Sequence, residues 1–309
     1  MIHHWTLQQF RLFEAVARLR SYTRAAGELH LSQPAVHIQV KRLEESMGLP
    51  LIEFVGKRLL LTVAGEEVYA TVQAVLAKLK YLEGALMDMK GKVSGALRIG
   101  AVSSAKFFIP DFLGHFLREH SEVQPLLKVT NRERIIERLI ANEDDFVIMG
   151  QVPEGMSLAV HPFMENILVP IAHPDHPLAG ERMIPLERFA AERFLMREAG
   201  SGTRSATERL LAEQGLKASI YMELGSSEAI KQAIMADLGV SVQSTSTLSL
   251  ELETGRIVTL DVVGFPRKRM WHAVHLQGKQ LNLTAATFLE FLVRKGAKHH
   301  LRTEAFKGH

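Results

Sequence analysis

The sequence contains no cysteine, no long apolar run and no N-terminal segment typical of export. Without cysteine the chain has neither disulfides nor thiolate ligands for zinc, which fits the reducing cytoplasm. The start, MIHHWTLQQFRLF, lacks the apolar stretch of a signal peptide. No run approaches the roughly 18 apolar residues that span a membrane. We therefore expect a cytoplasmic protein without membrane contact.

Motifs of catalysis and metal binding are also missing. No Ser/His/Asp set stands at motif spacing, and no nucleophile elbow is present. His173 to His176 (HPDH) offers metal-ligand residue types, but its prolines indicate an exposed turn. The terminal pairs His3-His4 and His299-His300 and the acidic run Glu143 to Asp145 are expected to be solvated. We expect no enzyme activity, no metal and no cofactor.

The charge is unevenly distributed along the 309 residues. Residues 1–62 hold eight Lys/Arg against five Glu, whereas the remaining chain holds 29 charges of each sign. The formal net charge of +3 therefore lies in the N-terminal segment, which indicates nucleic-acid binding. The length and the 47% hydrophobic content allow two or three domains with real cores.

Residues 21–47 read as two short helices joined by a tight turn. Ser21 to Leu29 is the first helix, and its small Ala25-Ala26 pair permits a close crossing. Ser32 caps the second helix, and Pro34 stands in its first turn, where a missing N–H does no harm. One face of this helix is apolar and another polar: Val36, Val40 and Leu43 against Gln33, His37, Lys41 and Glu44. Such a helix is built to enter the major groove of DNA.

A basic β-hairpin is expected next, around Phe54 to Leu61, with Gly56 at its turn. The run AAGELHLSQPAVHIQVKRLEESMGLPL, then GKRLLLTVAGE, resembles the winged helix-turn-helix of LysR-type transcriptional regulators. The SQPAV run, the LEE…G…L spacing and the LT-x-AG close are specific in combination. The alternative is a helical hairpin in some other domain. That alternative gives no role to Gln33, His37 and the Lys57-Arg58 tip.

The resemblance implies double-stranded DNA with an interrupted inverted repeat as partner. Amides and imidazoles suit base edges, and cations or hydroxyls suit phosphates. We predict base readout by Gln33, Pro34, His37 and Ile38 and phosphate contacts by Thr23, Ser32, Lys41, Arg42, Lys57 and Arg58. The family often has Ser where this chain has His37, and Phe-Glu-Arg where it has Ile52-Glu53-Phe54. Operator preference is therefore expected to differ from that of relatives, and Lys57 and Arg58 to carry more of the phosphate binding.

Residues 66–89 carry a heptad seam, which predicts a helix that pairs with another helix. The seam residues are Val68, Val72, Val75, Leu79, Leu82, Leu86 and Met89. The alternative is an amphipathic helix packed on its own chain. The resemblance implies a dimer-forming linker helix, and a homodimer or homotetramer. We assign residues 1–65 to the DNA-binding domain and 66–91 to the linker.

Beyond a polar hinge at Lys90 to Gly95, strand and helix patterns alternate, which predicts an α/β fold with a mostly parallel sheet. Strands are expected at 97–102, 126–130, 146–150, 194–197, 219–224, 240–243 and 269–276. Helices are expected at 109–119, 132–141, 202–214, 227–238 and 284–295, before a loose polar tail at 296–309. The resemblance implies a two-lobed, periplasmic-binding-protein-like effector domain at 92–299. Lobe I is 92–165 with 266–299, and lobe II is 166–265.

Ligands of open α/β sheets lie beyond the carboxyl ends of strands, against helix N-termini. The turn GSGTR (200–204) opens a helix with free N–H groups, although no Lys-Ser/Thr pair makes it a Walker loop. The predicted effector residues are Ser103, Ser104, Lys106, Thr130, Asn131, Arg132, Gln151, Gly200, Ser201, Gly202, Thr203 and Arg204. Ordinary helix capping is the alternative for such turns.

Four further phrases narrow the resemblance: TNRERIIERL, NEDDFVIMG, REAGSGTR and WHAVHLQGK. They look most like the Calvin-cycle (RuBisCO operon) regulators within the LysR family. That resemblance implies control of carbon-fixation genes by a small anionic effector, a phosphorylated metabolite or NADPH. The alternatives are a LysR-type regulator of another metabolic operon, a solute-binding module without DNA function, and an enzyme with an attached nucleic-acid domain. The SQPAV helix argues against the solute-binding module.

Overall fold

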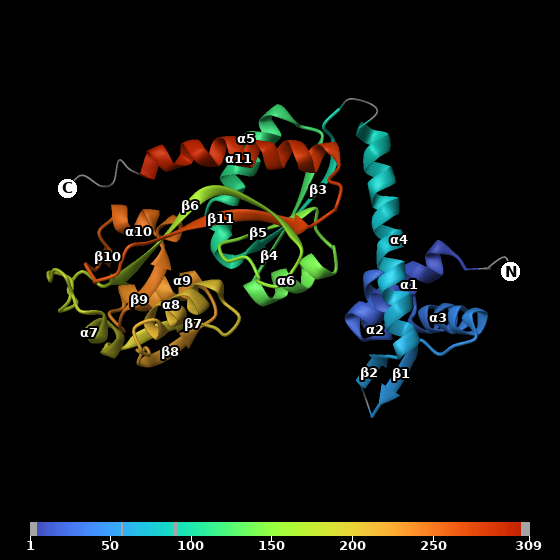
Figure 1. The fold of residues 1–309 in the computed structure, drawn as a ribbon, viewed down its shortest axis with the longest axis horizontal. Coiled ribbons are helices and arrows are strands. Elements are labelled where there is room, and N and C mark those ends of the chain that lie inside the picture. Colours follow the sequence, from blue (N-terminus) through green and yellow to red (C-terminus); the bar gives the residue numbers. More distant parts are fainter. Residues whose placement is uncertain (1–4, 57, 89–91, 304–309) are drawn as a thin grey trace. The chain divides into compact units, whose positions relative to one another are not determined.

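The computed structural model describes residues 5–56, 58–88 and 92–303. The chain divides into two compact units, and the division falls between Leu86 and Met87 in the sequence (Figure 1). Within the described ranges, no helix combines the length and apolar character needed to cross a membrane.

The N-terminal unit is a winged helix-turn-helix, as predicted. Its elements are α1 (Leu7–Leu19), α2 (Tyr22–Glu28), α3 (Gln33–Met47), β1 (Ile52–Val55), β2 (Arg58–Leu61) and α4 (Val63–Asp88). Thr6, Ser21 and Ser32 cap the first three helices, each accepting a hydrogen bond from a backbone N–H three residues on. Gly48 ends α3 in the left-handed conformation, with φ at 72°.

The core of this unit lies where the first three helices meet. Ala25 and Ala26 are buried beside the apolar face of α3, so the small pair does permit the predicted close crossing. In α1, Leu12 is buried, whereas Leu7 is 47% exposed. Leu7 is the first residue of the helix and extends past the edge of the core.

Glu44 was expected on the polar face of α3, and this expectation is wrong. Its side chain is buried, and Oε1 accepts hydrogen bonds from the backbone N–H groups of Leu51 at 2.8 Å and Ile52 at 3.0 Å. Oε2 lies 2.7 Å from Lys41 Nζ. Burial raises the pKa of this carboxyl, but the bonds from Lys41 and the two N–H groups outweigh it and lower the pKa. Glu44 therefore connects α3 to the start of the β1–β2 hairpin.

The long helix α4 begins at Val63, earlier than predicted. Val72 is 1% exposed and packs into the core of its own unit, where Val68, Tyr69 and Leu76 also lie. In the first half of the seam, the alternative of packing on its own chain therefore describes the observed contacts of Val68 and Val72. Farther along, Leu82 and Leu86 are 52% and 53% exposed, and Met89 lies outside the described residues.

The C-terminal unit contains a seven-stranded sheet in the order β10-β6-β11-β5-β3-β4, with β9 also paired to β6. Its strands are β3 (Gly95–Val102), β4 (Val123–Thr130), β5 (Phe146–Met149), β6 (Leu158–Ala172), β9 (Ser241–Ser244), β10 (Val258–Thr259) and β11 (Arg267–Leu276). A second sheet joins β7 (Phe194–Arg197) to β8 (Ile220–Leu224). The prediction of a mostly parallel sheet is wrong, because β6 and β11 run antiparallel to each other and to their other partners.

Two groups of helices cover two lobes, as expected (Figure 1). In lobe I these are η1 (Ser103–Phe107), α5 (Ile109–Glu119), α6 (Arg132–Ile140) and α11 (Leu283–Thr303). In lobe II they are α7 (Leu186–Ala191), α8 (Gly202–Ala212), α9 (Ser227–Met235), η2 (Thr245–Thr247) and α10 (Ser249–Glu253). Separate buried clusters, one rich in phenylalanine around β3 and β5 and two around β7 and β9, form the lobe cores.

The expected loose tail is wrong as far as Thr303, because α11 continues to that residue. Gly296 lets this part of α11 pack closely on β6. A Cβ at this position would lie 2.1 Å from the Phe163 carbonyl oxygen, so only glycine permits the approach. Residues 304–309 lie outside the described residues.

Replacing Glu44 with Ala should lower the free energy of unfolding of the N-terminal unit by about 2 kcal/mol, because two buried N–H groups lose their acceptor. The folded-state pKa of Glu44 is lowered, so its stabilisation is present above the unfolded-state pKa and is lost as pH falls through the folded value. Urea unfolding followed by Trp5 fluorescence, in a Trp271→Phe background, measures both effects. Glu45→Ala is the exposed control, and an equal loss in that variant would contradict the assignment.

Candidate nucleic-acid interface and ligand cleft

The outer face of α3 presents the side chains that were predicted to read DNA. Gln33, Pro34, Lys41 and Arg42 are exposed, and Ile38 is 49% exposed. Pro34, Ile38 and Lys41 are spaced four and three residues apart, so they share one face of the helix. A solvent-facing isoleucine among polar residues suits contact with a thymine methyl group.

His37 lies at the flank of this face rather than at its centre. It is half-buried, and its ring meets the Tyr22 ring edge-on, with centroids 5.0 Å apart. Burial, with a smaller contribution from Glu44, raises the pKa of Tyr22 to about 12, so the tyrosine stays neutral. The tyrosine ring therefore restricts the direction in which His37 points.

The predicted phosphate-binding residues have different surroundings. Thr23, Ser32 and Arg58 are exposed, and the Ser32 hydroxyl already caps α3 by accepting from Ala35 N. The Lys41 ammonium is shared with Glu44, which was not foreseen. Lys57 lies outside the described residues.

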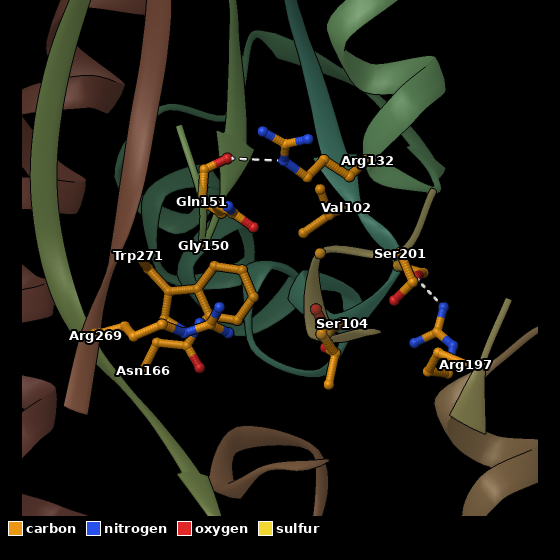
Figure 2. Close-up of a pocket in the computed structure, with 13 residues that line it drawn as sticks. Val102, Ser104, Arg132, Gly150, Gln151, Asn166, Arg197, Ser201, Arg269 and Trp271 are labelled. Carbon is orange, nitrogen blue, oxygen red and sulfur yellow. Dashed lines mark hydrogen bonds between the residues drawn. The ribbon is translucent and has the colours of Figure 1, made fainter. Parts of the chain in front are cut away.

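The C-terminal unit contains a cleft between its lobes, with an empty volume of about 360 Å³. The lining residues come from the ends of β3 and β5, from η1, from the N-termini of α6 and α8, and from the long strands β6 and β11 (Figure 2). Seven predicted effector residues line it: Ser103, Ser104, Arg132, Gln151, Ser201, Gly202 and Thr203. The carboxyl ends of separate strands therefore meet at one place, as the sequence indicates.

Five other predicted residues are not among the lining residues. Lys106 pairs with Glu228 at 2.5 Å, and Arg204 pairs with Glu208 and Glu223 at 2.8 and 2.5 Å. The remaining three are Thr130, Asn131 and Gly200. Asn131 caps α6 by accepting from Arg134 N, so the capping alternative describes its observed contact.

Gly200 has a backbone role beside the cleft. Its φ is 80°, and a Cβ there would lie 2.8 Å from Glu133 Oε2. The turn before α8 therefore needs glycine at this position.

Six lining residues were missed by the sequence prediction: Val102, Gly150, Asn166, Arg197, Arg269 and Trp271. Figure 2 shows Asn166, Arg269 and Trp271 together on the long strands, with Arg197 and Ser201 on the other side. The phrase RMWHAVHL predicted a strand that contains Arg269 and Trp271, but nothing in it indicated a course past the cleft. Gly150 makes room, since a Cβ there would lie 2.6 Å from Asn166 Nδ2.

Arg197 is one of three arginines in the cleft, and its charge is compensated. It is 2% exposed and forms two hydrogen bonds to the Glu198 carboxylate, of 2.7 and 2.9 Å. Nη1 donates to Ser227 Oγ and Nη2 to Ser103 Oγ, both at 3.0 Å. This network pairs the buried cation with a carboxylate and engages four of its five N–H donors.

The other two arginines have no carboxylate among the lining residues. Arg132 Nε donates to the Gln151 carbonyl oxygen at 3.1 Å, and burial, with Arg209 nearby, lowers its pKa. Burial lowers the pKa of Arg269 to about 10, and its Nε has no hydrogen-bond partner among the described residues. The same holds for the buried Nε1 of Trp271. Two guanidinium groups without a carboxylate in the lining and an indole N–H suit an anionic ligand.

Comparisons with known proteins match both units of the chain. Residues 7–66 match the family model for the bacterial regulatory helix-turn-helix protein, lysR family, and residues 90–297 match the LysR substrate binding domain. The RuBisCO operon transcriptional regulator of Allochromatium vinosum is 48% identical over 97% of this chain and 99% of its own length. The HTH-type transcriptional regulator CbbR of Rhodospirillum rubrum is 42% identical over 93% and 95%.

A solved structure resembles the C-terminal unit in particular. The Synechocystis PCC6803 CcmR regulatory domain, solved in complex with 2-PG, is 43% identical with a TM-score of 0.64. The match covers 66% of this chain and 98% of that domain.

Arg269→Met should raise the free energy of unfolding of the ligand-free C-terminal unit by about 2 kcal/mol, because it removes a partly buried charge that has no carboxylate among the cleft residues. The lowered pKa of Arg269 agrees with this direction, because it shows that the folded state disfavours the cation. At neutral pH the group nevertheless remains charged. Urea unfolding followed by Trp271 fluorescence, in a Trp5→Phe background, measures the change. Lys268→Met is the exposed control, and destabilisation by Arg269→Met would contradict this account.

Proposed function

The chain belongs to the LysR family of transcriptional regulators, and on that premise we propose that it controls carbon-fixation genes in response to a small phosphorylated acid. The observation that carries the proposal is the cleft itself, where Arg132 and Arg269 lack carboxylate partners. Similarity to RuBisCO operon regulators over nearly the whole chain supports the choice of genes. The protein acts in the cytoplasm, and it acts by binding rather than by catalysis.

The domain roles follow the two units. Residues 1–65 bind DNA, residues 66–91 link and pair two chains, and residues 92–299 bind the effector, with lobe I at 92–165 and 266–299 and lobe II at 166–265. Gln33, Pro34, His37 and Ile38 read bases. Thr23, Ser32, Lys41, Arg42, Lys57 and Arg58 hold phosphates, with Lys41 dividing its charge between DNA and Glu44.

Dimer formation is assigned to the second half of α4. Leu82 and Leu86 are more than half exposed, and Leu79 one turn earlier is partly exposed. Three leucines at spacings of three and four form an apolar stripe, which a second copy of the helix would cover. A dimer matches an inverted-repeat operator by its own symmetry. A monomeric wild-type protein in sedimentation would contradict this assignment.

The effector class follows from the charges in the cleft and from a related structure. 2-PG, the ligand of the CcmR regulatory domain, is 2-phosphoglycolate, a phosphate joined to a carboxylate. Two anionic groups match two uncompensated guanidinium groups and the N–H groups at the start of α8. This match of charged groups is the basis for proposing a small phosphorylated acid as the effector.

Gln33→Ala should weaken binding to the promoter DNA of a RuBisCO operon by ~1–3 kcal/mol, because one bidentate base contact is lost. Binding to scrambled DNA of the same length should not change, since phosphate contacts remain. Fluorescence anisotropy at fixed salt concentration measures both affinities, with Gln124→Ala in the other unit as the matched control. An equal loss on scrambled DNA would show that Gln33 does not read sequence.

Titration calorimetry with 2-phosphoglycolate should give binding to the wild type and about tenfold to hundredfold weaker binding to Arg269→Met, since a charge-assisted hydrogen bond is lost. Arg204→Met should bind nearly as well as the wild type, because Arg204 is engaged by Glu208 and Glu223. If the Arg204 variant loses binding and the Arg269 variant does not, the cleft is assigned wrongly. If the wild type does not bind, the effector proposal fails and the DNA-binding proposal stands.

A further inference from the structure

The short helix η1 carries contacts between the two lobes that the proposed function leaves unexplained. Lys106 Nζ of η1 lies 2.5 Å from Glu228 Oε1 of α9 in lobe II. Phe107, the next residue, lies beneath the Lys231 ammonium, with 4.7 Å from Nζ to the ring centroid. Neither Lys106 nor Phe107 lines the cleft. These two contacts between the lobes are therefore made beside the ligand site rather than within it.

Lys231 is held above the Phe107 ring by its burial and by an ion pair. It is 7% exposed, and its Nζ lies 2.8 Å from Glu251 Oε1. A buried ammonium over an aromatic face gains more from the ring than an exposed one does, because water competes less. Lys106 Nζ also lies 5.6 Å from the centroid of the same ring. Phe107 is thus held by cations from both lobes, and separation of the lobes would remove Lys231 and Glu228 together.

The same helix touches the cleft through Ser103. The Ser103 oxygen accepts from Arg197 Nη2 of lobe II at 3.0 Å. Among the residues that the structure describes, the Ser103 hydroxyl proton is donated to no protein acceptor. It is therefore available to an anion in the cleft. A hydroxyl that accepts from a guanidinium becomes a better donor, so an anion at Ser103 and the bond from Arg197 strengthen each other.

We propose that Lys106 and Phe107 are positioning residues, which hold η1 against lobe II and thereby raise the affinity of the cleft for its anionic effector. The inference rests on the proposed effector function. Thermodynamic linkage makes the effect reciprocal: whatever favours the closed lobes favours the ligand by the same factor, and the ligand favours closure equally. The sequence prediction gave Lys106 a direct contact with the effector, whereas this role acts through Ser103.

The first measurement is titration calorimetry of full-length variants with 2-phosphoglycolate. Lys106→Glu should bind roughly tenfold more weakly, within the usual range of coupling between sites. The double variant Lys106→Glu with Glu228→Lys should recover most of the affinity, because the ion pair is restored with reversed sign. Phe107→Leu should also weaken binding. Lys128→Glu makes the same charge change at an exposed position of lobe I and is the control for net charge.

The second measurement reports closure without any ligand. Because the chain has no cysteine, cysteines placed at the exposed positions Gln124 and Glu253 would be its only thiols for spin labels. Pulsed electron resonance on full-length protein, diluted with unlabelled chains, gives the distance distribution between the lobes. The distribution should be wider in Lys106→Glu and Phe107→Leu than in wild type, and should narrow again in the charge-swapped double variant.

The outcomes separate this inference from the effector proposal. Unchanged affinity and unchanged distributions in both variants would overturn the positioning role. Weaker binding by Lys106→Glu that the swap does not restore, with unchanged distributions, would overturn it in favour of direct contact between Lys106 and the ligand. If wild type binds no 2-phosphoglycolate, the distance distributions still decide whether these residues hold the lobes together.

Discussion

The antiparallel pairing of β6 with β11 is the constraint on which the C-terminal unit depends. The two strands remain paired from Leu158 and Leu276 at one end to Leu168 and Arg267 at the other. β11 also pairs with β5 in lobe I, and β6 with β9 and β10 in lobe II, so a single ribbon belongs to both lobes (Figure 1). The register shifts between Trp271 and His272, where an irregularity of this kind increases the local twist and redirects a side chain. Trp271 lines the cleft at that point, so its position depends on the ribbon that joins the lobes.

This ribbon also explains why the cleft can hold a cation without a partner. A buried guanidinium without a carboxylate is unfavourable, and a flexible loop would move it into water. β11 fixes the backbone of Arg269 within a paired strand, so the side chain remains in the cleft although burial lowers its pKa to about 10. An anion offsets that unfavourable term on binding. Part of the affinity for an effector is therefore the relief of an electrostatic cost that the empty fold carries.

Local signals predicted the regular elements well. The Ser32 cap, the helix Ile109–Glu119 and the strand Phe194–Arg197 are where the sequence indicates, because caps and periodicity act over a few residues. β6 was not recognised, since its first half (LAVHPFMEN) contains a proline and polar residues without strict alternation. The antiparallel sheet was missed for the same reason. Glu44 was misjudged because the N–H groups that donate to its carboxylate belong to Leu51 and Ile52, at the start of the hairpin. A helix pattern does not indicate that a neighbouring strand buries one polar residue.

The predicted effector residues show the limits of prediction from the sequence. Strand ends and helix N-termini predicted that Ser103, Arg132, Gln151 and the turn before α8 come together, and all of them line the cleft, because parallel strands present their carboxyl ends at one edge. The choice among cations was less successful. Lys106 and Arg204 stand beside those strand ends in sequence, yet each has a carboxylate partner. Arg269 stands within a strand, far away in sequence, and has none in the cleft. What makes a cation available to a ligand is the absence of a protein anion nearby, and tertiary structure alone decides which carboxylates are near.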